Sequence, residues 1–312
     1  MKKTILATAI LLVAGAANAA EIYNNEGTTV SLGGSFRGNV VIADSDNVKF
    51  QDSGTRFNIK AAKELDNGLK AFGRAEIKNS DHKDSKDKTN GLYLNQSYVG
   101  LAHDVYGTVI LGKQYGLNDD LVMNDFSYEN GVYNEDNDAF GSDSEDQLKY
   151  SKAFGGATVV VSLMDQDTYA IGGTYDVAGL ELGVSYNIAN DRKDAGVITD
   201  NSTYIMGARY TLDALVLAVQ YQASEVGSYD TSAYGIGAHY TLGQVGVYAM
   251  YDILDGDSKS NEGSELVIGA DYELAKGVIA YAEYNLSDRD AATTDRAEGT
   301  DSTLWLGGRV YF

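Results

Sequence analysis

The chain has 312 residues, a formal net charge of -21 at pH 7, 35 glycines, 23 tyrosines and neither proline nor cysteine. The lack of cysteine excludes a disulfide scaffold and thiol chemistry, and the acidic balance argues against a nucleic-acid binder, which needs a basic face. A bundle of membrane-spanning helices is also disfavoured, because it needs repeated apolar stretches of about 20 residues and the only long one lies near the start.

Residues 1–19 have the three parts of a secretory signal. Lys2 and Lys3 form a positive start, residues 4–15 are apolar, and Ala17-Asn18-Ala19 is a small-x-small cleavage site. The alternative is a buried N-terminal helix, but polar residues follow the small ones at once. We therefore expect a signal peptide at 1–19 and an exported mature chain at 20–312.

From Thr28 onward, segments of about ten residues alternate apolar with small or polar side chains, which is the two-residue period of a strand with unlike faces. One face of each segment suits hydrocarbon and the other suits water. The sequence predicts sixteen strands, at residues 28–42, 54–65, 68–79, 91–102, 106–114, 146–154, 156–164, 167–177, 180–190, 202–212, 214–224, 231–242, 244–254, 264–274, 277–287 and 302–312.

The predicted connections alternate in length. Tight turns such as Asp66-Asn67-Gly68 and Gly155-Gly156 join strands as hairpins do. Between the hairpins lie longer polar stretches, including 44–53, 80–90, 190–201, 255–263 and 287–301. Short turns on one rim and long loops on the other are typical of an outer-membrane barrel.

The sequence therefore predicts an all-β fold: a 16-stranded antiparallel transmembrane β-barrel with short periplasmic turns and long extracellular loops. In hydrocarbon a sheet can satisfy every backbone N–H and C=O only by closing on itself, and the missing prolines leave no gap in its ladder. A soluble β-sandwich or a secreted solenoid also alternates, but neither has a reason for unequal rims. Sixteen strands leave a water-filled channel.

Five short motifs resemble one family of barrels. They are Ala20-Glu21-Ile22-Tyr23-Asn24, Thr55-Arg56-Phe57-Asn58-Ile59-Lys60, Tyr98-Val99-Gly100-Leu101, Leu111-Gly112-Lys113-Gln114-Tyr115-Gly116 and the terminal Val310-Tyr311-Phe312. In order and spacing the chain resembles the Gram-negative general porins, the trimeric diffusion porins of the OmpF and OmpC type, and most closely their Vibrio and Photobacterium members. The resemblance covers essentially the whole mature chain.

This resemblance implies a homotrimer in which the third extracellular loop, here about residues 116–146, folds into each barrel and narrows it. Acids of the loop would face a basic wall, with Asp125, Glu129, Glu135, Asp136 and Asp138 on the acidic side. Alternation along the strands gives Arg37, Arg56, Arg74 and Lys113 as the basic side. Two alternatives remain: a solvated acidic loop that binds divalent cations, and basic residues that only pair with neighbouring acids.

The resemblance also implies partners. They are outer-membrane lipid, lipopolysaccharide, small hydrophilic solutes and cations, and the barrel-assembly machinery, for which Tyr311 and Phe312 would form the C-terminal assembly signal.

The sequence departs from the family where the channel narrows. Asn95-Gln96-Ser97 and Asp143-Ser144-Glu145-Asp146 stand where family members often carry arginines, and residues 138–141 lack the family's Pro-Glu-Phe-Gly-Gly. Fewer positive and more negative charges favour cations. We therefore expect a cation-selective channel for passive diffusion of small hydrophilic solutes and ions.

No motif predicts an enzyme, a metal site or a cofactor. The three histidines, at 82, 103 and 239, do not form a nucleophile–base pair in the predicted topology, and Asp136-Asn137-Asp138 does not continue as a calcium loop. Two other functions stay open. A solute-specific channel would carry a line of lumenal aromatic residues, and a structural or adhesive barrel would not conduct.

Overall fold

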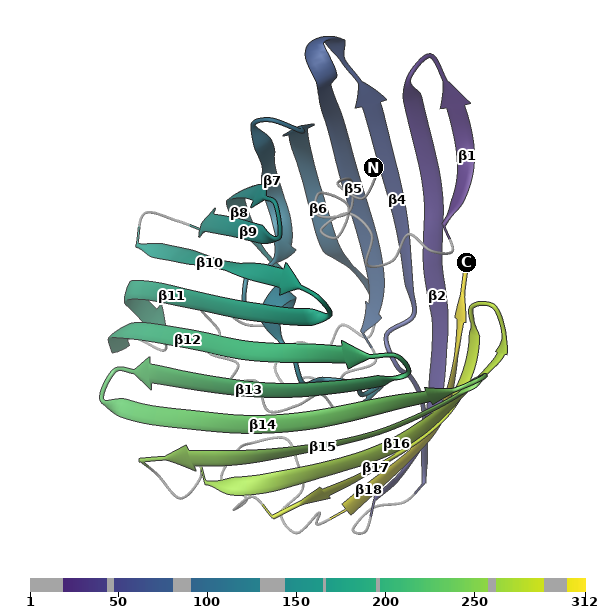
Figure 1. The fold of residues 1–312 in the computed structure, drawn as a ribbon, viewed down its shortest axis with the longest axis vertical. Helices are drawn as coiled ribbons and strands as arrows, with labels where there is room; N and C mark the ends of the chain where they lie inside the picture. Colours follow the sequence, from purple (N-terminus) through teal and green to yellow (C-terminus); the bar gives the residue numbers. More distant parts are fainter. Residues whose placement is uncertain are drawn as a thin grey trace.

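The computed structural model describes residues 19–43, 48–80, 91–129, 144–164, 167–194, 197–257, 262–288 and 302–312, which form a single antiparallel sheet (Figure 1). The predicted signal peptide, apart from Ala19, lies outside these residues. Among the described residues no helix is both long enough and apolar enough to span a membrane.

The elements follow one another as alternating strands. Their bounds are β1 Ala20–Asn25, β2 Thr28–Ala43, β3 Lys49–Asp52, β4 Arg56–Glu64, β5 Leu69–Ser80, β6 Gly91–His103, β7 Gly107–Tyr115, β8 Ser144–Phe154, β9 Ala157–Leu163, β10 Thr168–Val177, β11 Leu180–Asp194, β12 Val197–Leu212, β13 Leu215–Val226, β14 Tyr229–Leu242, β15 Val245–Gly256, β16 Gly263–Ala275, β17 Val278–Ser287 and β18 Ser302–Tyr311, with short 3-10 turns η1 Asp66–Gly68 and η2 Asp119–Leu121.

Sixteen of these eighteen strands close into a ring, which confirms the predicted barrel. Each strand pairs with the next along the chain from β4 to β18, and β2 closes the seam by pairing with β4 on one side and β18 on the other. β1 also pairs with β2, beyond the end of β18, so β1 and β18 lie end to end along one edge of β2.

Two strands are absent from the sequence prediction, and β11 and β12 extend well beyond their predicted bounds. β1 and β3 are too short to show a two-residue period, and the structure reveals them through their pairing with β2. The stretch 190–201 is a loop in the sequence prediction. In the structure, β11 continues to Asp194 and β12 begins at Val197. The residues of this stretch are mostly polar, so the sequence shows no two-residue period there. The longer hairpin is evident only from the pairing of β11 with β12.

The two faces of the sheet differ as predicted. On β15, Val247 and Tyr251 point outward, with 46% and 38% of their surface exposed, whereas Met250 and Asp252 point inward and are 1% and 4% exposed. Tyrosines recur on the outward face near strand ends, as in the aromatic girdles of membrane barrels. They include Tyr175, Tyr186, Tyr240 and Tyr272.

The tight turns need left-handed backbone. Asn67 adopts φ 61° between β4 and β5, and Asp213 adopts φ 51° between β12 and β13. Short polar side chains tolerate this conformation. Asp213 lies in a two-residue turn, because Leu212 pairs with Leu215, whereas Asn67 lies in the longer turn η1. These turns fix the register of the flanking strands, and hence which side chains face the interior.

Candidate functional site

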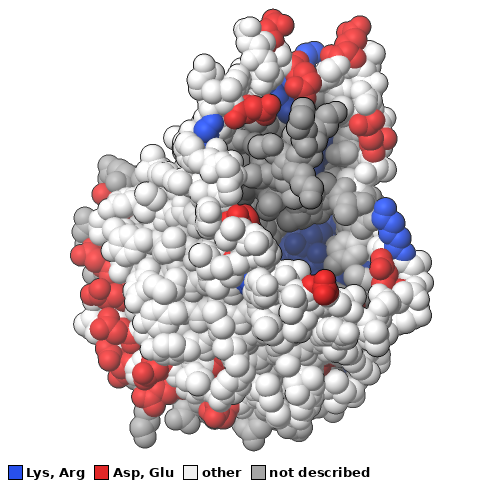
Figure 2. Space-filling model, viewed as in Figure 1, with Lys and Arg blue, Asp and Glu red and all other residues white. Residues whose placement is uncertain are grey.

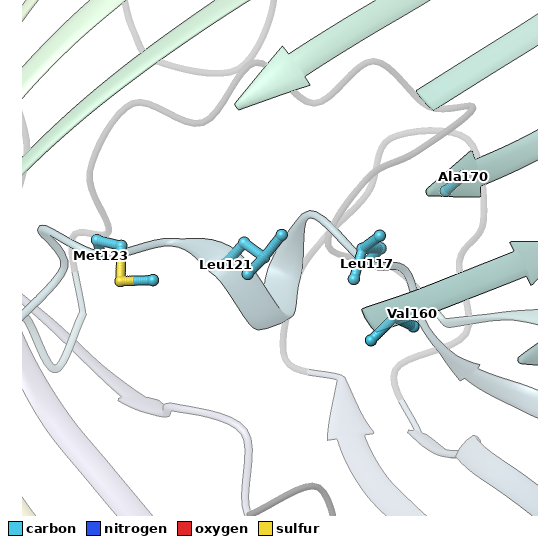
Figure 3. Packing of buried hydrophobic residues seen from close by; sticks show 5 residues of the cluster. All are labelled: Leu117, Leu121, Met123, Val160 and Ala170. Atoms are coloured by element: carbon cyan, nitrogen blue, oxygen red, sulfur yellow. The ribbon is translucent and has the colours of Figure 1, made fainter. Parts of the chain in front are cut away.

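Residues 117–129 of the third loop run inside the barrel along its inner wall. Leu117 and Leu121 pack in one buried cluster with Met123, Val160 of β9 and Ala170 of β10 (Figure 3). Further along, Val122, Phe126 and Tyr128 pack against a second cluster formed by Tyr248, Met250 and Val267. The loop therefore crosses the wall from β9 towards β18, and its apolar side chains face that wall.

A row of glycines makes room for the loop on the inner face of the wall. A Cβ built on Gly172 would lie 2.9 Å from the Leu117 side chain, one on Gly207 would lie 2.6 Å from Met123, and one on Gly237 would lie 2.7 Å from the Asn124 carbonyl oxygen. Gly183 and Gly235 are equally close to the loop. Any larger residue at these positions would push the loop off the wall.

Side chains of the wall hold the backbone of the loop. Gln220 accepts a hydrogen bond from the Met123 N–H at 2.7 Å, and Arg209 donates two to the Met123 carbonyl at 3.0 and 2.6 Å. Asn124 donates its side-chain amide to Asp252 at 2.9 Å. Loops in compact proteins usually satisfy their backbone with water, so these bonds fix a segment that would otherwise be free to move.

Glu283 of β17 is the most enclosed anchor. Its side chain is 0% exposed, and its carboxylate accepts hydrogen bonds from the backbone N–H of Tyr128 at 2.8 Å and of Glu129 at 3.2 Å. The Tyr248 hydroxyl donates a third at 2.7 Å. A buried carboxylate is tolerated where several donors satisfy it, and here two of those donors belong to the loop.

Three of the predicted basic residues come together on the opposite wall. Arg37 of β2, Arg56 of β4 and Arg74 of β5 line one cavity of about 310 Å³. Figure 2 shows Lys and Arg side chains inside the hollow of the barrel, while Asp and Glu gather along its outer margin. The other residues that line this cavity are Gly34, Ser35, Asn58, Glu76, Gln96, Tyr98, Ile110, Gln114, Tyr115, Asp119, Lys149 and Tyr311.

Glu76 organises the arginines. It is 2% exposed, forms an ion pair with Arg74, lies 3.9 Å from Arg56, and accepts a hydrogen bond from Asn95 at 2.8 Å. Arg37 instead donates to Ser35 at 2.8 Å and lies over the Tyr311 ring at 5.9 Å. Pairing with a strand acid, the alternative noted for these residues, therefore applies to Arg56 and Arg74, and both still line the cavity.

Lys113 does not join this cluster, so that prediction is wrong. On β7 it is in phase with the outward Val109 and Leu111, and it pairs in register with Asp146, whereas Ile110 and Gln114 face the interior. Three apolar residues in a row, 109–111, gave the alternation two possible phases. Lys149 of β8, which pairs with Ile110, supplies the cation at this part of the cavity and donates to the Tyr115 carbonyl at 2.9 Å.

Two of the predicted loop acids can be placed. Asp125 accepts hydrogen bonds from the backbone and hydroxyl of Ser127 at 2.8 and 2.7 Å. Burial raises the pKa of Asp125, and the hydrogen bonds from Ser127 oppose that shift. Glu129 pairs with Arg309 at 3.3 Å. The predicted Glu135, Asp136 and Asp138 lie outside the described residues.

The C-terminal residues close the seam. Phe312 exchanges backbone hydrogen bonds with Gly34 at 2.9 and 3.1 Å. Its ring packs 5.5 Å from Phe36 and 5.9 Å from Phe57, while Tyr311 lines the inner cavity. A role for Tyr311 and Phe312 as an assembly signal stays a prediction.

Four further site residues could not be predicted from the sequence: Lys149, Arg209, Glu283 and Arg309. Alternation does place Arg309 on the polar face of the last strand. Nothing in the sequence, however, indicates that the third loop, more than a hundred residues earlier, ends against it. For the same reason, nothing in the sequence distinguishes Glu283 and Arg209 from other charged residues on the strands.

Comparisons with known proteins agree with this architecture. The family model for Gram-negative porins matches residues 6–292. A "Major outer membrane protein" of Pasteurella multocida (strain Pm70) is 33% identical over 196 residues, which cover 58% of this chain and 55% of that relative. The chain thus matches little more than half the length of that relative. A "Monosaccharide porin" of Halomonas sp is 27% identical across 93% of this chain and 96% of its own.

Solved structures share the fold at low sequence identity. The trimer form of OmpT, an outer membrane protein of Vibrio cholerae, superposes with a TM-score of 0.75 at 18% identity, covering 92% of this chain and all of its own. An anion-selective porin from Comamonas acidovorans gives a TM-score of 0.74 at 19% identity, covering 91% of this chain and 100% of that one. With the family model spanning most of the sequence, the chain belongs to the Gram-negative porin family and its barrel spans the outer membrane.

Proposed function

We propose that this porin is a water-filled channel for the passive diffusion of small hydrophilic solutes and ions. One observation carries the proposal: a loop pinned along one inner wall faces a cavity lined by Arg37, Arg56 and Arg74 on the other. A solute that passes between them must stay hydrated and cross opposed charges, so small polar molecules are favoured over bulky apolar ones.

Cation selectivity is the finer part of the proposal. Its support is the formal net charge of -21 and the acids of the third loop, among them Asp119, which reaches the basic cavity, and the half-buried Asp125. An anion-selective porin shares this fold, so the fold alone does not set the charge preference, which must depend on the charges of each chain.

We also propose a homotrimer. The outward face of β4 to β7 carries an apolar groove of about 590 Å³ with small residues, Ala61, Ala71 and Gly73, between the larger Val99 and Leu101. Small residues allow close approach of another protein surface within a membrane. The similar OmpT of Vibrio cholerae forms a trimer. Lipopolysaccharide and the barrel-assembly machinery remain proposed partners.

Reconstitution in a planar bilayer tests the function. We expect stepwise conductance with three equal closing steps, and a reversal potential in a salt gradient whose sign corresponds to cation preference. Anion preference would contradict the selectivity, and the absence of any conductance would contradict the channel itself.

The same bilayer measurements distinguish a diffusion channel from a solute-specific channel. Conductance of a diffusion channel should rise in proportion to salt and show no saturable block by monosaccharides. Saturable block would instead favour a specific sugar channel.

A further inference from the structure

The described part of the third loop ends against β17 and β18 in a compact set of contacts. The Arg309 guanidinium donates to the Tyr128 carbonyl and lies 3.3 Å from the Glu129 carboxylate. It also lies over the Tyr128 ring at 4.8 Å and the Tyr281 ring at 5.6 Å. We call this set, formed by Tyr128, Glu129, Tyr281 and Arg309, the loop latch.

The two tyrosines complete the latch. Their rings stack at 4.6 Å with an interplanar angle of 10°, and the Tyr281 hydroxyl donates to the Glu129 carboxylate. The Arg309 and Glu129 side chains are only 11% and 9% exposed. Guanidinium–aromatic contacts and charge-assisted hydrogen bonds both strengthen when they are shielded from water, so this corner holds the end of the loop firmly.

A second arginine holds the other end of the same segment in a similar way. Arg209 donates to the Met123 carbonyl and lies over the Phe126 ring at 5.4 Å. Residues 123–129 are thus clamped at both ends, each time by a guanidinium that binds a loop carbonyl and covers a loop ring. The two clamps differ in position, because Arg309 alone of the two lies beside the basic wall.

That position follows from the register of the seam. Arg309 pairs directly with Arg37 across β18 and β2, and Arg37 lines the cavity with Arg56 and Arg74. The latch therefore sits where the loop meets the basic wall. It holds the Glu129 carboxylate beside Arg309, whose cross-strand neighbour is Arg37, and Arg309 offsets the charge of that carboxylate.

We propose that Arg309 is a positioning and specificity-determining residue of this channel: it fixes the end of the constriction loop and masks the Glu129 carboxylate from passing ions. The proposal rests on the proposed channel function. A planar guanidinium is required for the first task, because lysine cannot both stack on the tyrosines and chelate a carbonyl and a carboxylate. A positive charge suffices for the second.

Substitutions separate the two tasks. Arg309→Met removes the charge and exposes Glu129, so the permeability ratio of cations to anions should rise about threefold, the combined effect on a cation and an anion of one unit charge about 12 Å away in water. It should also increase brief closures of single channels. Arg309→Lys should keep the ratio near that of the wild type while the closures increase.

A double substitution tests whether Arg309 acts through Glu129. In the Glu129→Gln background the ratio should start below that of the wild type, because Arg309 is then uncompensated, and Arg309→Met should bring it back close to the wild-type value, because both charges of the pair are gone. Lys70→Met is the matched control: it removes a positive charge from the rim, where Lys70 pairs with Glu64 at 3.1 Å, and should leave both ratio and closures unchanged.

The outcomes are distinguishable. Loss of heat-modifiable migration on a gel would show that Arg309→Met does not fold, and Arg309→Lys would then carry the test through its closures. Wild-type ratio and closures in folded Arg309 variants, or a double variant whose ratio stays as high as that of Arg309→Met alone, would overturn the latch. A wild-type protein that does not conduct would overturn the channel function instead.

Discussion

Asp125 shows how one side chain of the loop can make the channel sensitive to pH. Burial raises the pKa of this carboxyl, and the two hydrogen bonds from Ser127 favour its charged form and partly offset the shift. Because the pKa is raised, Asp125 takes up its proton at a higher pH than an exposed aspartate does. The folded loop is correspondingly stabilised as the pH falls through that range.

We expect cation preference to decline on acidification earlier than exposed carboxylates would allow. Asp125→Asn should lower the preference at pH 7 and remove the early part of the decline. Ser127→Ala should move the decline to higher pH, because it removes the hydroxyl that favours the ionised form. Reversal potentials measured from pH 7 to pH 4 test this, and identical profiles for all three proteins would contradict it.

The residues whose inward direction could be predicted from the sequence share a simple geometry. Arg37, Arg56 and Arg74 lie on strands with a single clear alternation, so their direction follows from the period of two. Lys113 follows three consecutive apolar residues, 109–111, where either phase fits the pattern. At that point the two-residue period fits either direction of the Lys113 side chain, and the pairing of β7 with β8 determines which direction the structure adopts.

At the scale of elements, the third loop depends on the wall beneath it. Gly172, Gly183, Gly207, Gly235 and Gly237 stand on the inner face where the loop crosses. Glycine weakens a strand, and its repeated use here indicates that close approach of the loop backbone outweighs that cost. Strand positions could be predicted from the sequence, but this groove could not, because it arises from contacts between segments far apart in the chain.

Gly237→Val tests the groove. A Cβ at this position would lie 2.7 Å from the Asn124 carbonyl oxygen and 2.8 Å from the Phe126 ring, so the loop must shift into the lumen. We expect lower single-channel conductance and a loss of about 1–3 kcal/mol of stability, the usual effect of overpacking. The barrel itself should still form.

Gly91→Val is the control for a bulky residue on a strand. Among the described residues other than its chain neighbours, no atom lies within 4 Å of a Cβ built at Gly91, so conductance and thermal unfolding in detergent should match the wild type. Unchanged conductance in Gly237→Val would show that the loop does not need the groove.

The electric field of the whole barrel sets the expected salt dependence. The formal net charge is -21, while the described cavity is lined by three arginines and a lysine. Long-range attraction of cations by the acidic molecule is screened within about 10 Å at 0.1 M salt and about 3 Å at 1 M. Selectivity should therefore weaken as salt rises.

Reversal potentials at a fixed concentration ratio, measured from about 0.1 M to about 1 M mean salt, test this dependence. We expect the cation preference to fall steadily towards that of free ions. A preference that is independent of salt would place its origin in the unscreened charges at the narrowest point, not in the field of the whole barrel.

The seam between β2 and β18 has a consequence for how the molecule forms. Thr303 pairs with Ala43 and Tyr311 with Ser35, so the first long strand finds its last neighbour only when the far end of the polypeptide arrives. Loop-closure entropy makes such distant pairings slow. Until then β2 presents a bare edge of N–H and C=O groups, and a nascent molecule must be kept from pairing that edge with another of its kind.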